Sequence, residues 1–274
     1  MLWIIQHNLW KEEGFTSLIN ALRRFNCPYE VVRVVPFTNR LIPVDYDQSI
    51  ENLDDIPEPK IPTDGPIMVC GSVTLAKIAK KRGWTPGSFL NENFDYSKWR
   101  ENYGANLLNF DSTVTRFDEI LFPEANPLFI RPCHDTKAFS GKVFERDYFV
   151  KWQQDVLDLQ TPDSILRGDT LVAVAPLKQI YQEFRFFVVD KVLVTQSQYK
   201  LGNRIIHNAN VDPDIIDYAQ QMVDLWQPAR AFVIDIALTS EGMRIVEINN
   251  LNSAGFYACD VMKIVAAIEN MSFC

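Results

Sequence analysis

The chain of 274 residues has few of the side chains that build common metal centres and covalent cross-links. It contains 5 cysteines and 3 histidines, which are scattered and never form a C-x-x-C pair. A zinc site or a disulfide framework needs closely spaced ligands or paired cysteines. We therefore predict neither, and no histidine-based metal centre. The sequence also lacks a G-x-S-x-G elbow and a persuasive Cys/His arrangement, so no motif indicates a side-chain nucleophile.

Positive charge and long apolar runs are also scarce. The 27 lysine and arginine residues are outnumbered by 35 aspartate and glutamate residues, which gives a formal net charge of -8. A protein that neutralises a nucleic-acid backbone needs a basic surface, so nucleic acid is not an expected partner. Residues 1–7 carry no basic segment, and polar residues interrupt their apolar run too early for a signal peptide or a membrane span. We expect a cytoplasmic protein with no membrane partner.

The first 120 residues alternate apolar runs with helical patterns. Hydrophobic residues make up 47% of the chain, and the length favours two domains. The strand-like and helical segments follow one another at 2–6, 14–25, 29–36, 67–70 and 71–81. This rhythm is typical of an open parallel α/β sheet, so we predict a Rossmann-like domain over residues 1–120. No G-x-G-x-x-G follows the first two strands, which disfavours a dinucleotide-dependent oxidoreductase.

Residues 84–118 are rich in aromatic side chains and turn-forming residues. Aromatic stripes most often fill a hydrophobic core, so the segment is interpreted first as a packed connector. A lid or a substrate surface is the alternative, and the sequence leaves it open.

From about residue 122 longer strands and hairpins replace the earlier alternation of strands and helices. A hairpin is predicted around Asp190, and Asp212 is expected to cap a helix that has Pro213 at its first position. Asp147 is the expected N-cap of an earlier helix. The remaining strands and helices are expected at 127–131, 142–145, 147–157, 170–175, 229–238, 243–251 and 260–270. Residues 121–274 are therefore predicted to form a separate α+β unit.

The most informative feature is an acidic hairpin near the C-terminus. A three-residue loop over 240–242, with its final glycine in a left-handed conformation, is a common hairpin solution. This loop pairs Thr239 with Met243 and consequently places Asp235 opposite Glu247. Like charges directly across a strand pair repel, so this arrangement needs a compensating partner.

A divalent cation is one such partner. Side chains alternate faces along a strand, so Ile245, Glu247 and Asn249 are predicted to share one face and Val246 the other. Asp235, Glu247 and Asn249 would then converge within an apolar sheet. Oxygen-only ligands suit Mg²⁺, which binds through one or two carboxylates plus substrate phosphates. The alternative is a surface hairpin whose acidic residues face water.

A cationic segment could supply the matching phosphate site. Arg131 ends an apolar strand, where a lone cation is costly unless it meets an anion. Lys137, Ser140, Gly141 and Lys142 follow in a loop whose glycine lets backbone N–H groups approach a phosphate. The segment lacks the Walker A pattern, so a P-loop enzyme is disfavoured. A solvated, charged turn is the alternative.

Glu183 and Arg185 share one face of another apolar strand. They could pair with each other or with a neighbouring strand. Alternatively, the carboxylate could bind ribose hydroxyl groups and the guanidinium a phosphate or substrate oxygen.

The order of these motifs resembles that of the ATP-grasp superfamily, and their form resembles a divergent clade often encoded by phages. The resemblance covers roughly residues 122–270. It is carried by Phe-Ile-Arg131-Pro, Lys137-Ala-Phe-Ser-Gly141, Glu183-Phe-Arg185 and Val-Glu247-Ile-Asn249-Asn. It implies an ATP-grasp fold of two α+β subdomains, roughly 121–172 and 173–274, behind a Rossmann-like N-terminal domain. If a phage encodes the chain, its expected location is the host cytoplasm.

The resemblance also implies a nucleotide site. Arg131 stands where the family usually has a lysine that touches the α- and β-phosphates. The loop with Lys137, Ser140, Gly141 and Lys142 would close over the phosphates, and Glu183 would meet the ribose. The strand 172–178 would hold adenine through backbone groups, with Val174 and Ala175 as the expected contacts.

By the same likeness Asp235, Glu247 and Asn249 are the ligands of two Mg²⁺ ions. Arg185 and Lys200 would face the γ-phosphate or an acyl-phosphate. The expected catalytic side chains are thus Arg185, Lys200 and Arg131.

The implied activity is that of an ATP- and Mg²⁺-dependent ligase. ATP would phosphorylate a carboxylate, and an amine or a thiol would attack the acyl-phosphate, with ADP and phosphate as products. The carboxylate and the acceptor would be small molecules, peptides or proteins, and the polar segment 250–257 could line the acceptor site or serve as a connector. The alternative is an inactive nucleotide-binding adaptor, which the arginine at position 131 favours. The motifs do not indicate an oligomeric state.

Overall fold

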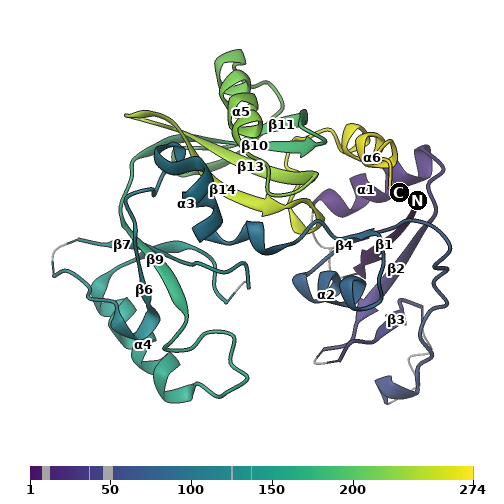
Figure 1. Ribbon diagram of the computed structural model, residues 1–274, viewed down its shortest axis with the longest axis horizontal. Coiled ribbons are helices and arrows are strands. Elements are labelled where there is room, and N and C mark those ends of the chain that lie inside the picture. Colours follow the sequence, from purple (N-terminus) through teal and green to yellow (C-terminus); the bar gives the residue numbers. More distant parts are fainter. Residues whose placement is uncertain (8–12, 37, 46–51, 125, 137, 274) are drawn as a thin grey trace.

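The computed structural model describes the chain except residues 8–12, 37, 46–51, 125, 137 and 274. Its strands form three sheets, and the C-terminal sheet lies between the other two (Figure 1). Among the residues described, no helix combines the length and the apolar character needed to cross a bilayer.

The N-terminal sheet has the strand order β3-β2-β1-β4-β5. Its strands are β1 (Leu2–Gln6), β2 (Tyr29–Val34), β3 (Leu41–Pro43), β4 (Ile67–Cys70) and β5 (Pro86–Gly87). β1 pairs in parallel with β2 and β4, as its alternation with helices predicts, whereas β3 is antiparallel. Helices α1 (Glu13–Arg24) and α2 (Val73–Lys81) connect these strands. Ser72 caps α2 by accepting a hydrogen bond from the Leu75 backbone N–H.

A second, antiparallel sheet has the order β6-β9-β7-β8. It contains β6 (Thr113–Arg116), β7 (Leu128–Pro132), β8 (Lys142–Phe144) and β9 (Leu171–Pro176), and α4 (Arg146–Leu159) packs on it. β6 precedes residue 120, where we predicted the domain boundary, yet it pairs with β9. Asp147 lies within the first turn of α4, and Glu145 is the N-cap, so the predicted capping residue is wrong.

The third sheet has the order β12-β11-β10-β13-β14 and is antiparallel throughout. It contains β10 (Ile180–Val189), β11 (Val192–Leu201), β12 (Arg204–Asn208), β13 (Ala231–Thr239) and β14 (Gly242–Asn250). Helix α5 (Pro213–Leu225) covers one face, and Asp212 caps it by accepting from the Asp214 N–H, as predicted. β12 was not predicted because its residues are mostly exposed and lack a clear apolar alternation.

The two faces of β10 enter different cores. Phe184, Phe186 and Val188 pack with β13, β14 and α5. Phe187 and Val189 face the other way and join a core that includes α1 and α6 (Val261–Glu269). Figure 1 shows the two chain termini side by side near these two helices. The N-terminal and C-terminal sheets are therefore joined by one continuous hydrophobic core.

The aromatic segment fills core, as its first interpretation predicts. The short helix η3 (Glu92–Phe94) leads into α3 (Tyr96–Tyr103), and both pack against the C-terminal sheet. Phe94, Tyr96, Trp99 and Tyr103 are all buried.

The acidic hairpin is present, but its register differs in detail from the prediction. Thr239 pairs with Gly242, not with Met243, although Gly242 does adopt a positive φ of 97°. A bulge at Val246 inserts one extra residue into β14, so Asp235 still pairs with Glu247. The predicted pairing of the two acidic residues is therefore correct, and the predicted turn register is wrong by one residue.

Candidate functional site

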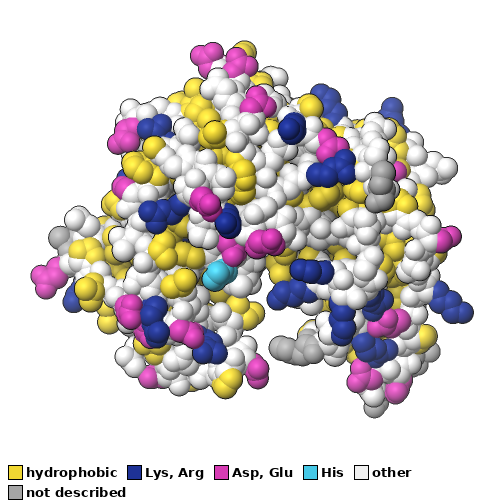
Figure 2. All heavy atoms as spheres, viewed as in Figure 1, with side chains coloured by type: hydrophobic (Ala, Val, Ile, Leu, Met, Phe, Trp, Pro, Cys, Tyr) yellow, Lys and Arg dark blue, Asp and Glu magenta, His cyan; other side chains and the backbone are white. Residues whose placement is uncertain are grey.

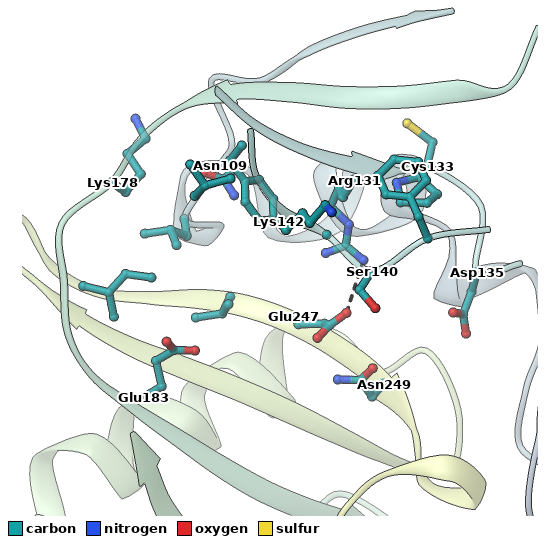
Figure 3. Close-up of a pocket in the computed structure, with 18 of the residues that line it drawn as sticks. Asn109, Arg131, Cys133, Asp135, Ser140, Lys142, Lys178, Glu183, Glu247 and Asn249 are labelled. Atoms are coloured by element: carbon teal, nitrogen blue, oxygen red, sulfur yellow. Dashed lines mark hydrogen bonds and ion pairs between the residues drawn. The ribbon is translucent and has the colours of Figure 1, made fainter. Parts of the chain in front are cut away.

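A cavity of about 550 Å³ lies between the sheet of β6–β9 and the sheet of β10–β14. Its volume is within the range of small-molecule sites. Figure 3 shows Arg131, Ser140 and Lys142 on one side of it, which we call the roof, and Glu183, Glu247 and Asn249 on the opposite side, the floor. On the face drawn in Figure 2, acidic and basic side chains lie close together near the middle of the molecule.

Arg131, at the end of β7, is the principal cation of the roof. Its guanidinium lies 4.3 Å from the Trp99 ring centroid and 5.4 Å from that of Tyr96. Only 15% of the side chain is exposed, and the buried Nε has no hydrogen-bond partner. Nη2 is 3.5 Å from a Glu247 carboxylate oxygen, across the cavity. Aromatic rings thus hold a cation that retains donors for an anionic ligand.

The loop before β8 and the first residue of β8 supply the remaining predicted roof residues that are described. Ser140, Gly141 and Lys142 line the cavity, whereas Lys137 lies outside the described residues. A Cβ at Gly141 would approach Arg131 Cβ to 3.1 Å, so glycine allows the loop to pack closely across β7. Lys142 Nζ lies 4.8 Å from the Phe144 ring centroid, which limits how the ammonium group can move.

Glu183 lies on the floor and is buried. It accepts a hydrogen bond from the Tyr199 hydroxyl at 2.6 Å and another from Lys200 Nζ at 2.5 Å. Tyr199 is the extra residue of a β-bulge in β11, which lets two consecutive side chains reach the same carboxylate. Lys200, which was predicted to face the γ-phosphate or an acyl-phosphate, lines the cavity and is paired with the predicted ribose ligand. A carboxylate has about four lone-pair sites, so Glu183 retains acceptor capacity for a hydroxyl group.

Glu247 and Asn249 lie on the same face of β14 and line the cavity, as predicted. The bulge changes the rest of the predicted pattern: Val246 lines the cavity with them, and Ile245 is in the core with Ile248. Strict alternation therefore fails at this point. Asn249 Nδ2 is buried without a hydrogen-bond partner, so this amide can still bind a ligand. It lies near the partly exposed carboxylate of Glu247.

Asp235 and Arg185 differ most from their predicted places. Neither lines the cavity, and they form a buried pair in which Arg185 Nε and Nη2 donate to the two Asp235 oxygens at 2.9 and 2.7 Å. Arg185 Nη1 also donates to the carbonyl oxygen of Gly255. Burial raises the pKa of Asp235, and Arg185 opposes that rise. The alternative that Arg185 pairs with a neighbouring strand is thus the one observed.

The two predicted adenine contacts belong to β9. Val174 and Ala175 do not line the cavity, because β9 is a central strand whose backbone pairs with β7 and, at Val174, also with β6. The cavity wall is formed two to three residues later, by Leu177 and Lys178. Lys178 Nζ is 2.6 Å from an Asp111 oxygen.

Sequence reasoning missed three aromatic residues of the site. The segment with Tyr96 and Trp99 was interpreted first as a packed connector, with a lid or a substrate surface as the alternative, and its contact with Arg131 was not foreseen. Tyr199 was not singled out. The one available signal was that Tyr199 directly precedes Lys200, which was itself predicted to be a site residue.

The donor set can be compared with what Mg²⁺ requires. Glu247 and Asn249 fit, because an accessible carboxylate and an under-used amide face the same cavity. Asp235 is held by Arg185 and is only 1% exposed, so it would need a rearrangement to act as a ligand. Within the part of the chain that the structure describes, no three His, Cys, Asp or Glu side chains form a metal cluster.

Comparisons with known proteins agree on the fold. The crystal structure of D-cycloserine synthetase DcsG is 13% identical, with 97% of this chain and 98% of that chain covered and a TM-score of 0.61. A RimK domain ATP-grasp protein from Sphaerobacter thermophilus DSM 20745 is 15% identical, with the same coverage and a TM-score of 0.63. D-alanine–D-alanine ligase from Bacillus anthracis complexed with ATP is 12% identical, with 98% and 97% covered and a TM-score of 0.56. No curated protein sequence matches the chain.

The sequence itself matches one family model, which is described as an ATP-grasp domain, family 3 of its clade, and covers residues 42–268. This range includes every described roof and floor residue named above. The chain therefore has the ATP-grasp fold and belongs to the ATP-grasp domain family that this model describes.

Proposed function

We propose that this protein is an ATP- and Mg²⁺-dependent ligase that joins a carboxylate to an amine, or to a thiol, through an acyl-phosphate. The observation that carries the proposal is the cavity between two sheets, with cations on its roof and two acidic residues and an amide on its floor. The family match supports ATP as the nucleotide, and one similar structure is that of a ligase complexed with ATP.

The nucleotide would lie along the cavity. Figure 3 places Lys178 and Glu183 toward one end and Arg131, Ser140 and Asn249 farther along. Leu177 and Ile180 line the cavity near the start of β10, which suits an adenine ring, and Glu183 would accept from the ribose. The phosphates would lie under Arg131. Its Nε has no hydrogen-bond partner and its Nη2 makes only a long contact with Glu247, so its guanidinium can donate to phosphate oxygens.

Glu247 and Asn249 would hold Mg²⁺, which when bound neutralises charge on the phosphates. In the reaction, an oxygen of the substrate carboxylate bonds to the γ-phosphorus as ADP leaves. The amine then bonds to the acyl carbon, phosphate leaves, and the amine loses a proton to solvent. Arg131 and Lys142 orient the phosphates and offset negative charge, so positioning and electrostatics carry the catalysis.

The first test uses hydroxylamine in place of the unknown amine, because it traps an acyl-phosphate as a hydroxamate. We expect ADP and hydroxamate to form from ATP, Mg²⁺ and a pool of carboxylates. Glu247→Gln should lower the rate at least about a hundredfold, because it removes the charged floor ligand. Glu241→Gln, at an exposed position in the turn of the same hairpin, is the matched control and should retain the wild-type rate. Wild-type turnover by Glu247→Gln would contradict the assignment.

A nucleotide-binding adaptor without ligase activity is the second candidate. It is favoured by one observation: Arg185 and Asp235, both assigned to the active site from the sequence, form a closed pair outside the cavity. ATP binding measured by calorimetry, with no ADP released under any carboxylate, would support the adaptor.

A further inference from the structure

A second cavity of about 290 Å³ lies between the N-terminal sheet and the segment that follows β14. Its walls come from β1, α1, α6 and residues 251–257. No charged side chain is among the described residues that line it. The large apolar side chains of the wall are Trp3, Phe15, Leu18, Leu251, Phe256 and Ile264.

Asn252 and Ser253, two polar residues of this wall, use their side chains in hydrogen bonds to other parts of the chain. Asn252 Oδ1 accepts from the Phe89 N–H at 2.9 Å, and its Nδ2 donates to the Val69 carbonyl at 2.6 Å. The Ser253 hydroxyl donates to Asn250 at 3.1 Å. Burial raises the pKa of the Cys70 thiol to about 12, so the thiol is neutral at physiological pH. The cavity therefore presents an uncharged and mainly apolar surface.

The second cavity adjoins the nucleotide cavity. Tyr199 lines the first and Tyr257 lines the second, and their rings stack with centroids 4.8 Å apart. Asn249 and Leu251 also line different cavities, and two residues of chain span at most about 7 Å. Tyr257 has a positive φ of 50°, an uncommon conformation for a non-glycine residue. A molecule in the second cavity would thus be within reach of the phosphate end of the first.

We infer that the second cavity binds a bulky apolar side chain of the carboxylate substrate, next to the carboxylate that is phosphorylated. The inference rests on the proposed ligase function and adds the substrate class. An apolar cavity of about 150 Å³ is known to hold a benzene ring. The volume here is about 290 Å³, enough for a leucine, phenylalanine or tryptophan side chain together with its α-carbon.

Two features at the cavity favour a carboxylate over an amine. Gly14 and Phe15, in the first turn of α1, line the wall, so the positive end of that helix dipole lies there. The second feature is that no acidic residue lines the cavity among the residues described, so an ammonium group would find no counter-charge there. Arg185 also reaches this wall, where its Nη1 donates to the Gly255 carbonyl at 3.0 Å, but Asp235 balances its charge.

The test measures hydroxamate formation from single carboxylates. L-leucine, L-phenylalanine and L-tryptophan are compared with glycine, L-aspartate and L-lysine, and N-acetyl-glycyl-L-phenylalanine distinguishes a peptide C-terminus from a free amino acid. We expect the bulky apolar carboxylates, free or at a peptide C-terminus, to react at least tenfold faster. Binding of the same compounds is measured by ligand-observed NMR with AMPPNP and Mg²⁺ present.

Two variants locate the side-chain site. Ala254→Phe places a ring in the cavity, and Val192→Phe, which adds a ring at an exposed position that lines neither cavity, is its control. Gly14→Ala would put a Cβ 2.2 Å from Phe256 Cδ2, which forces that ring to move within the cavity wall. Both Ala254→Phe and Gly14→Ala should weaken phenylalanine binding at least tenfold while AMPPNP still binds, which also shows that the variants are folded.

The outcomes separate this inference from the proposed function. Phenylalanine binding that Ala254→Phe abolishes, without any hydroxamate, would contradict the ligase while upholding an apolar binding site. Hydroxamate formed preferentially from glycine, aspartate or lysine would uphold the ligase and overturn the inference. Equal loss of all substrates in Ala254→Phe, with AMPPNP binding intact, would also overturn it.

Discussion

The buried pair of Arg185 and Asp235 permits a stringent test, because the chain contains an exposed pair of the same geometry. The side chains of Arg185 and Asp235 are 10% and 2% exposed, and their two hydrogen bonds measure 2.9 and 2.7 Å. Arg116 and Asp118 form bonds of 2.9 and 2.7 Å, but their side chains are 46% and 30% exposed. The comparison therefore varies burial at constant bond length.

Asp235→Leu leaves a buried guanidinium without its counter-charge. Breaking a buried pair on one side costs about 3–5 kcal/mol of unfolding free energy, whereas replacing both members by apolar residues is often neutral. We expect a loss of that size in Asp235→Leu and recovery of most of it in Arg185→Met/Asp235→Leu. For a chain of this size, 1 kcal/mol corresponds to roughly 2–4 °C in Tm, so the single variant should melt at least about 6 °C lower.

Urea unfolding at pH 7, followed by far-UV circular dichroism, gives the four free energies of the double-mutant cycle. The corresponding cycle on Arg116→Met and Asp118→Leu should show far weaker coupling, because water screens the exposed pair. A double variant at positions 185 and 235 that is as unstable as Asp235→Leu would refute this reasoning. So would equal coupling in the two cycles.

Three further predictions concern the roof, the thiols and a turn. Arg131→Lys should raise the Kd for ATP about tenfold, as measured by calorimetry. An ammonium group cannot both stack on Trp99 and offer two parallel N–H donors to a phosphate, as a guanidinium can. An unchanged Kd would contradict a phosphate-binding role for Arg131. Burial raises the pKa of Cys70 and of Cys259 to about 12, so at pH 8 their thiolate fractions are roughly a thousandfold below that of a thiol at 9.0. Their labelling by a disulfide reagent should be slow in the native state and should accelerate as the pH rises, and rapid native labelling at pH 8 would argue against burial. Lys191 lies in the turn after β10 with a φ of 75°, which is strained for a residue with a side chain. Lys191→Gly should therefore raise the free energy of unfolding, measured in urea, by up to about 1 kcal/mol. A lower free energy of unfolding in this variant would refute the strain.

The hairpin shows both the reach and the limit of sequence reasoning. The prediction paired Asp235 with Glu247 correctly, although the turn was off by one residue and a bulge at Val246 was missed. The two errors cancel for residues beyond the bulge. Alternation and turn chemistry are local, so they can be read from a sequence, but a bulge depends on the partner strand.

The partner of Asp235 could not be predicted, because it depends on which strand lies on the other side of β13. That strand is β10, and its register places Arg185 directly beside Asp235. The position of Val174 outside the cavity could not be predicted for a similar reason. Val174 occupies a central strand, and its backbone is already paired on both sides. The order in which strands pair within a sheet depends on residues far apart in the sequence, so the local sequence around Asp235 or Val174 does not predict it.

The core that α1 shares with α6 has a consequence for synthesis on the ribosome. Helix α1 ends at Arg24, and its partner α6 begins at Val261. At translation speeds of about 5–20 residues per second, the nascent first helix waits roughly 10–50 s before that partner is made. During this interval the apolar surface around Trp3 and Leu18 lacks part of its cover, so these early residues are where chaperone binding to the unfinished chain is expected.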